Sequence, residues 1–326
     1  MKTILTAAFI ALTTTSAFAH DSIQITGSST VLPFATIAAE AFGENTNSGT
    51  PIVEGGGTGA GIKKFCEGVG DNTVDIADAS RQMKDEEKAL CVANGVTEIT
   101  EVRLGYDGIV FATDINGAPF ALTPSEVYLA INKDSITATW NVINPDLPNQ
   151  KILMLVPGTK HGTREVFDQK VVLQGCKDTG KYDEFLATLT DPKAAEKECT
   201  SLRTDGTVVE IDGDYTETLN RLKTDTDAVG VFGLSFYKNN TATLQVATVN
   251  GVEPTVETIA DGSYPVSRPL YFYVKNAHLG SVPGLADFVK FFVSDEMAGP
   301  DGALVEDGLV SDPKLADTQQ SVDGLN

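Results

Sequence analysis

A local pattern that occurs three times limits what this chain can fold into. In segments 22–42, 51–65 and 152–167 a short apolar stretch leads into a turn rich in glycine, serine and threonine, and then into apolar residues at helical spacing. A strand that runs through a short turn directly into a helix is the building unit of α/β sheets. The chain is therefore predicted to have an α/β fold.

The length of the chain predicts two lobes. Its 326 residues exceed the size at which a single hydrophobic core usually keeps growing. Two strands are placed to connect the lobes, because segment 103–111 is almost continuously apolar after its start and segment 269–274 is its late counterpart. We predict a discontinuous first lobe of residues 20–105 plus 268–326, a second lobe of residues 106–267, and a two-strand hinge between them.

Both ends of the chain have a composition unlike that of a folded core. Residues 1–19 have the layout of a secretory signal peptide, with Lys2, the apolar run 4–12 and a cleavage point after Ala19. The run is shorter than the roughly 20 apolar residues of a membrane helix, and no later segment approaches that length. The mature protein is therefore expected to be soluble and exported. The acidic segment 301–326 has few apolar residues, and its end is expected to be mobile.

The charge of the chain limits its partners. The formal net charge is −21 at pH 7, which argues against nucleic acid or an anionic membrane surface as the partner. A small anion is not excluded, because a buried site of backbone dipoles and one or two arginines acts at short range, where salt screens little.

Four cysteines follow the signal peptide. An even number in an oxidising compartment predicts disulfides, and the pairs nearest in sequence are Cys66 with Cys91 and Cys176 with Cys199. The other two pairings remain open on the sequence alone. A zinc site is the alternative, but no two cysteines have the close CxxC spacing that zinc favours, and no metal is expected.

Several turns carry the residues of an anion site. The first backbone N–H groups of a helix lack internal partners, and the helix dipole adds positive potential there. Glycine lets an anion approach, and serine or threonine adds a donor without charge. The turns at 26–30, 55–61 and 157–163 have this composition, as does Ala79-Ser80-Arg81. Each alone is consistent with a simple N-cap, but together they predict an anion site built from both lobes.

A set of short segments resembles the PstS family of periplasmic phosphate-binding proteins. They are residues 27–31, 57–61, 75–81, 162–164, 229–233 and 267–270. Their order and spacing agree with the family over essentially the whole mature chain. The resemblance implies a type II periplasmic-binding-protein fold, in which two α/β lobes close over inorganic phosphate in the cleft between them. It also implies a periplasmic location and delivery to the permease subunits of an ABC transporter. A monomer with no cofactor is expected.

Carried over residue by residue, the resemblance implies a phosphate site with contacts from both lobes. The implied contacts are Ser29, Thr30, Val31, Thr58, Ser80, Arg81, Gly162, Thr163 and Arg164. Asp107 and His161 are added as candidates at positions where the chain departs from the family. Arg81 is the strongest candidate, because a planar guanidinium matches two phosphate oxygens at once. The alternative is a surface arginine in the first turn of a helix. Arg164 either contacts the ligand or forms a salt bridge that braces the site.

Two positions depart from the family pattern. Many relatives have serine where this chain has His161, which either donates to phosphate, and so makes binding depend on pH near its usual pKa of about 6.5, or points outward. Some relatives have an aspartate where this chain has Arg81. Asp107 is the predicted replacement, because a buried carboxylate accepts the proton that phosphate carries and repels sulfate, which has none. The alternative is an exposed or hinge carboxylate.

Two other functions compete with phosphate binding. A phosphohydrolase would need a metal cluster or an activated nucleophile, whereas the histidines His20, His161 and His278 lie far apart in sequence. No catalytic residue is therefore assigned. A binding protein of the same fold for sulfate, molybdate or a phosphonate is not excluded by the fold alone, but the hydroxyl-rich turns and Ser80-Arg81 favour phosphate.

Overall fold

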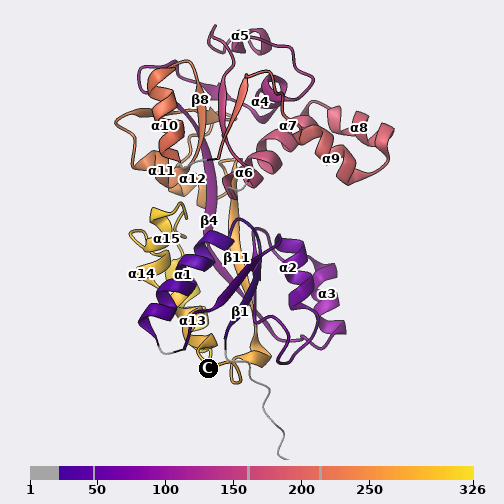
Figure 1. The fold of residues 1–326 in the computed structure, drawn as a ribbon, viewed down its shortest axis with the longest axis vertical. Coiled ribbons are helices and arrows are strands. Elements are labelled where there is room, and N and C mark those ends of the chain that lie inside the picture. Colours follow the sequence, from indigo (N-terminus) through magenta and orange to yellow (C-terminus); the bar gives the residue numbers. More distant parts are fainter. Residues whose placement is uncertain (1–21, 47, 160–161, 213–214) are drawn as a thin grey trace, which may run out of the picture.

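The computed structural model describes residues 22–46, 48–159, 162–212 and 215–326. These residues form two lobes stacked end to end, with strands running from one lobe into the other (Figure 1). The predicted signal peptide, His20 and His161 lie outside the described residues. No helix in the described ranges is long and apolar enough to cross a membrane.

Within the described residues, one sheet of nine strands extends through both lobes. The strands of the chain are β1 (Gln24–Gly27), β2 (Ile52–Gly55), β3 (Ile76–Ala79), β4 (Ile99–Asp114), β5 (Ala121–Leu122), β6 (Met154–Pro157), β7 (Val208–Ile211), β8 (Val229–Gly233), β9 (Leu244–Val246), β10 (Thr248–Val249) and β11 (Ser267–Lys275). The sheet order is β2-β1-β3-β11-β4-β8-β6-β7, with β9 also paired to β4. β5 and β10 form a separate two-stranded sheet.

Helices cover the faces of this sheet. In the lower lobe of Figure 1 they are α1 (Leu32–Asn45), α2 (Thr58–Phe65), α3 (Asp85–Ala93), α13 (Leu285–Phe292), α14 (Asp295–Ala298), α15 (Ala303–Glu306), α16 (Leu315–Val322) and the 3-10 helix η2 (Asn276–His278). The others are α4 (Pro124–Ile131), α5 (Trp140–Ile143), α6 (Gly162–Val166), the π-helix η1 (Phe167–Val172), α7 (Leu173–Asp178), α8 (Lys181–Leu189), α9 (Pro192–Thr200), α10 (Tyr215–Thr224), α11 (Leu234–Lys238) and α12 (Val256–Ala260).

The three predicted strand–helix junctions are β1–α1, β2–α2 and β6–α6. β1 is parallel to β2 and β3, and β6 is parallel to β7 and β8. Parallel neighbours need a crossover connection, which a helix usually provides. The prediction of an α/β fold is confirmed.

Two long antiparallel strands connect the lobes. β4 pairs with β11 over Ile99–Gly108 and then with β8 over Ile109–Ala112. From Leu104 to Asp114 every residue of β4 is buried. Burial on both faces of the sheet explains why this part of the strand is almost continuously apolar. Asp107 on β4 lies directly opposite Arg268 on β11, so these two charged residues meet where the chain passes between the lobes.

The hydrophobic cores lie on either side of this crossing. One core draws on segment 106–266 together with Val310, and the others draw on segments 23–104 and 270–322. Trp140 is fully buried in the first of these cores and packs against Phe120. It begins α5, which lies at the end of its lobe away from the hinge (Figure 1).

Most of the C-terminal segment packs against the first lobe, although its composition gives it few apolar anchors. Leu304, Leu309, Leu315 and Val322 are buried, and Val310 forms a β-bridge with Tyr106 of β4. Widely spaced apolar residues are enough to anchor the segment as far as Val322. The predicted mobility of the last stretch stays a prediction.

Two disulfides are present in the described residues. Cys66 is bonded to Cys91 and joins the end of α2 to α3, while Cys176 is bonded to Cys199 and joins α7 to α9. The Cα atoms of the two pairs lie 4.2 and 5.6 Å apart. The prediction of two sequence-local disulfides is confirmed.

Candidate functional site

A cavity of about 500 Å³ lies where the two lobes meet the hinge strands. Its lining comes from three parts of the chain: the turns after β2 and β3, the helical segment α6–η1 of the other lobe, and the start of β11. The lining residues are Thr58, Gly59, Ser80, Arg81, Gln82, Glu165, Gln169, Lys170, Arg268, Pro269 and Tyr271. Three of the predicted site residues, Thr58, Ser80 and Arg81, therefore share one cavity.

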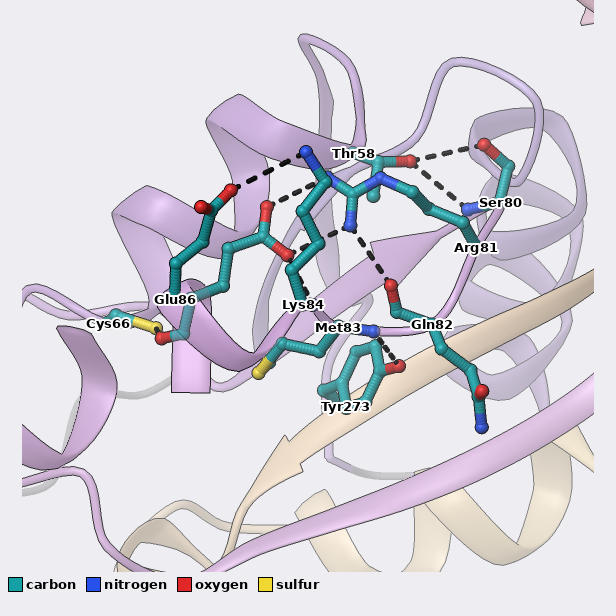
Figure 2. Close-up of polar contacts among 10 residues, drawn as sticks. Thr58, Cys66, Ser80, Arg81, Gln82, Met83, Lys84, Glu86 and Tyr273 are labelled. Carbon is teal, nitrogen blue, oxygen red and sulfur yellow. Dashed lines mark hydrogen bonds and ion pairs between the residues drawn. The ribbon is translucent and has the colours of Figure 1, made fainter. Parts of the chain in front are cut away.

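Two glycines allow α2 to lie directly on β1 and so position its first residue. A Cβ atom on Gly61 would lie 2.3 Å from the Cα of Gly27, and one on Gly27 would lie 2.1 Å from the backbone oxygen of Asp78. Any side chain at these positions would push the elements apart. The close approach brings Thr58 to Ser80, whose N–H donates to Thr58 Oγ1 at 3.1 Å while the two hydroxyls lie 3.2 Å apart (Figure 2).

Thr30 precedes α1 at the edge of the same region. Its side chain is buried, and its Oγ1 accepts a hydrogen bond from Arg268 Nη2 and donates to Glu165 Oε2 at 3.1 Å. Val31 is fully buried at the N-cap position of α1, whereas Ser29 is exposed. Among the residues predicted for the first turn, Thr30 is therefore the one whose side chain contacts the other lobe.

Arg268 is the cavity cation that the sequence interpretation missed. It is only 4% exposed, and its Nη1 donates to Gln169 at 3.4 Å. Its Nε faces Asp107 Oδ2 at 3.8 Å, and neither of these atoms has a hydrogen-bond partner among the described residues. Segment 267–270 carries part of the family resemblance, and an arginine within an otherwise apolar strand is a signal that would have identified it.

Asp107 lies behind Arg268 and does not line the cavity itself. Burial raises the pKa of Asp107; the nearby Arg268 partly counteracts this, and the nearby Glu165 adds to it. Of the two alternatives, an exposed carboxylate is excluded, because the residue is only 8% exposed. The pKa of Asp107 therefore depends on the charges near it, those of Arg268 and Glu165.

The guanidinium of Arg81 is held in a bidentate pair with Glu87, at 2.8 and 2.7 Å, and also donates to the backbone oxygen of Gln82 at 3.0 Å (Figure 2). Glu87 is the third residue of α3, where it also accepts from the N–H of Lys84 at 2.8 Å. Arg81 thus lines the cavity with its fork directed at α3. The Arg81 side chain is 36% exposed, and both of its terminal nitrogens already donate within the first lobe.

Arg164 adopts the bracing arrangement. It is buried and pairs with Asp168 at 2.8 Å and with Glu210 at 2.9 Å, and it donates to the backbone oxygen of Pro157 at 3.3 Å. These contacts tie α6 to β6 and β7. Arg164 is absent from the cavity lining, so the salt-bridge alternative describes it in this structure.

The remaining predicted residues of the second lobe lie at the start of α6. Gly162 is the first residue of α6, and the hydroxyl of Thr163 is hydrogen-bonded to that of Tyr215. Burial raises the pKa of Tyr215 to about 12. Its hydroxyl is protonated at neutral pH, as in any tyrosine, and either hydroxyl of the pair can be the donor. The predicted contact of His161 falls outside the described residues.

Positive charge is concentrated at the cavity despite the acidic chain. Lys170, on η1, lines the cavity, and burial together with the nearby Arg268 lowers its pKa. Arg81 and Arg268 add two guanidinium groups, while Glu165 contributes a carboxylate. A cavity that combines these cations with hydroxyl donors suits an oxyanion. Among the described residues, no group of three or more metal-ligating side chains is arranged to hold an ion.

Comparison with known families and proteins gives a consistent result. The family model described as a PBP superfamily domain matches residues 12–296. The phosphate-binding protein PstS of Staphylococcus saprophyticus is 30% identical over 304 residues, which are 90% of this chain and 81% of that protein. The PstS of Staphylococcus epidermidis is also 30% identical, over 88% of this chain and 78% of that protein.

Solved structures show the same fold. A possible phosphate binding protein from Planctomyces limnophilus aligns with a TM-score of 0.71 at 25% identity, covering 92% of this chain and 97% of that one. A putative phosphate ABC transporter substrate-binding protein from Clostridium perfringens, solved with bound phosphate, aligns with a TM-score of 0.53 at 25% identity, covering 89% and 99%. The type II periplasmic-binding-protein fold is confirmed.

Proposed function

This chain belongs to the PstS family of phosphate-binding proteins within the PBP superfamily, and on that premise we propose that it captures inorganic phosphate in the cavity between its lobes and delivers it to an ABC permease. Members of this family are binding receptors, and no catalytic step is proposed. The Staphylococcus saprophyticus PstS and the Planctomyces limnophilus protein match 90% and 92% of this chain, so the proposal concerns both lobes.

The observation that carries the proposal is the burial of Arg268 at the floor of the cavity. A guanidinium that is 4% exposed needs negative charge and hydrogen-bond acceptors to offset its lost hydration. Its nearest carboxylates, Asp107 and Glu165, lie 3.8 and 3.7 Å away, beyond good hydrogen-bonding distance. A phosphate oxygen in the cavity would supply the close acceptor that these carboxylates do not.

The proposed phosphate contacts come from both lobes. Thr30, Thr58, Ser80, Arg81 and Arg268 would donate from the first lobe and the hinge. The loop that ends at Gly162 and Thr163, with His161 before it, would close over the anion from the second lobe. Hydroxyl and backbone donors suit phosphate, because they stabilise its charge without fixing its protonation state. Arg164 would hold the second-lobe loop in place without touching the ligand.

The proposed lobes are residues 20–105 plus 268–326 and residues 106–267, with β4 and β11 as the hinge. The partition of the hydrophobic cores supports these boundaries, because almost no core residue lies on the wrong side of them. Two strands that pass between lobes permit the hinge closure that is typical of such receptors. Val310, which packs with the second-lobe core, is the exception.

Export and assembly are also proposed. Residues 1–19 would act as a cleavable signal peptide that directs a monomer to the periplasm. Asp107 would favour phosphate over sulfate by accepting the proton that phosphate carries and sulfate lacks. This contact requires the anion to reach past the present cavity lining, because Asp107 lies beside Arg268 and not in that lining.

Isothermal titration calorimetry tests the proposal. Protein stripped of ligand by unfolding and refolding is titrated with phosphate, arsenate, sulfate and molybdate. The expected result is binding of one phosphate per chain, with sulfate and molybdate much weaker. Tighter binding of sulfate or molybdate would assign the cavity to another oxyanion. Trp140 is unsuitable as a probe of closure, because it is buried at the far end of the second lobe.

A further inference from the structure

We propose that Glu165 is a competing anion built into the receptor. Its carboxylate reaches from the second lobe to donors of the first lobe and the hinge, holds the ligand-free lobes together, and must leave before phosphate binds. This inference rests on the proposed phosphate site and adds a residue that limits its affinity.

The contacts of Glu165 join three parts of the molecule. Its Oε2 accepts from the hydroxyl of Thr30 at 3.1 Å, and its Oε1 lies 3.7 Å from Arg268 Nη1. Gln169, one helical turn on, donates to Glu165 Oε1 at 3.3 Å and accepts from Arg268 at 3.4 Å. Glu165 and Gln169 belong to α6 and η1, Thr30 precedes α1, and Arg268 lies on β11. The carboxylate therefore forms part of a direct link between the lobes.

These donors are those proposed to bind phosphate. A threonine hydroxyl has a single proton to donate, and Thr30 gives it to Glu165. A phosphate oxygen cannot accept the Thr30 hydrogen bond while that bond is made to the Glu165 carboxylate. Two anions within about 4 Å of each other also repel strongly in a partly buried site. Phosphate and the Glu165 carboxylate in its present position therefore compete for the Thr30 donor and repel each other.

The side chain is free to move aside. It is 33% exposed and lines the cavity, in contrast to Asp107, which is buried behind Arg268. A glutamate at the cavity wall can rotate outward to water, whereas Asp107 has no such path. The two carboxylates near Arg268 thus have different roles: Asp107 stays with the guanidinium, and Glu165 gives way to the ligand.

If Glu165 helped to bind phosphate and did not compete with it, neutralising Glu165 would change the Kd for phosphate in the opposite direction. If the carboxylate stayed in place and accepted a proton from bound phosphate, its neutralisation would weaken binding. If it competes with phosphate, neutralisation strengthens binding. The direction of the change in Kd separates the two.

The test uses Glu165→Gln, Glu165→Ala and a control, Glu184→Gln. Glu184 pairs with Lys181 on α8 at 2.6 Å, well exposed, and its replacement changes the net charge equally. Calorimetry with inorganic phosphate should give a Kd about tenfold lower for Glu165→Gln than for wild type, as expected for removing one charged competitor. The control should match wild type. A higher or unchanged Kd for Glu165→Gln overturns the proposal.

A second measurement does not depend on phosphate. Small-angle X-ray scattering of ligand-free protein should give a larger radius of gyration for Glu165→Ala than for wild type and Glu184→Gln, because the link between the lobes is lost. An equal radius overturns the link. Wild-type protein that fails to bind phosphate would refute the proposed function, and the scattering result would still decide whether Glu165 joins the lobes.

Discussion

Replacement of Arg268 by methionine removes the buried charge and keeps most of the side-chain volume. The variant loses donors to Thr30 and Gln169 and the cation that faces Asp107. A hydrogen bond to a charged group contributes about 1.5 to 3 kcal/mol, so loss of the proposed contact with phosphate should raise Kd by about 10- to 100-fold. Calorimetry of refolded, ligand-free protein measures this directly.

Stability and binding must be separated in this experiment. Arg268→Met leaves Asp107 buried without a cation, and the free energy of unfolding should fall by about 1 to 3 kcal/mol. The double variant Asp107→Asn with Arg268→Met should recover part of that loss, because asparagine carries no charge, but it should not recover phosphate affinity. Urea unfolding reports the stability of each variant.

A matched control replaces another buried arginine. Arg203 is paired with Asp205 in the second lobe and does not line the cavity, so Arg203→Met should lower stability and leave the Kd for phosphate unchanged. Binding by Arg268→Met within about threefold of wild type, a difference below 1 kcal/mol, would refute the assignment of Arg268 as a phosphate contact.

Three further predictions concern titratable residues. Asp107→Asn should narrow the preference for phosphate over sulfate in calorimetry, and equal losses for the two anions would argue against a selective role. Burial raises the pKa of Asp78 well above its usual 3.8, so its stabilising contribution is full below that pH and is lost as the pH rises through the folded pKa. Asp78→Asn should therefore gain stability over wild type in urea unfolding at neutral pH but not in acid, and a difference independent of pH would count against burial as the cause. His161→Ser should retain phosphate binding but weaken its variation between about pH 6 and 8; an unchanged pH profile would reject a contact from His161.

The fold could be predicted largely from local sequence pattern. The turns after β1, β2 and β6 combine glycine and hydroxyl residues with flanking apolar periodicity, and each of these signals lies within about twenty residues of chain. The crossing strand was recognisable because burial on both faces produces a continuous apolar run. The C-terminal segment was not, since its few leucines are widely spaced and find partners only in the assembled lobe.

The candidate site was predictable only in part. Thr58 and Ser80 meet because two glycines bring α2 onto β1, a contact that the motif itself encodes. The direction of Arg81 depends on Glu87, and that of Arg164 depends on Asp168 and Glu210, which are choices among several nearby carboxylates. Such pairings depend on side-chain geometry in the folded protein, and the sequence does not rank them.

The two carboxylates near Arg268, those of Asp107 and Glu165, come close to it only in the tertiary fold. Arg268 and Asp107 lie far apart in the chain and become cross-strand neighbours only through the register of β4 and β11. Glu165 joins them from the other lobe. No local pattern contains this arrangement, which explains why Glu165 was absent from the residues implied by the family resemblance. Arg268 did have a local signal in segment 267–270, but its partners Asp107 and Glu165 did not.

A crystal structure of the refolded protein with inorganic phosphate tests the central claim most directly. The account predicts one phosphate in the cavity, within hydrogen-bonding distance of Arg268, Thr30 and the Thr58–Ser80 pair, with the Glu165 carboxylate turned away from Thr30. Phosphate bound elsewhere, or phosphate in the cavity with Glu165 still accepting from Thr30, would contradict it.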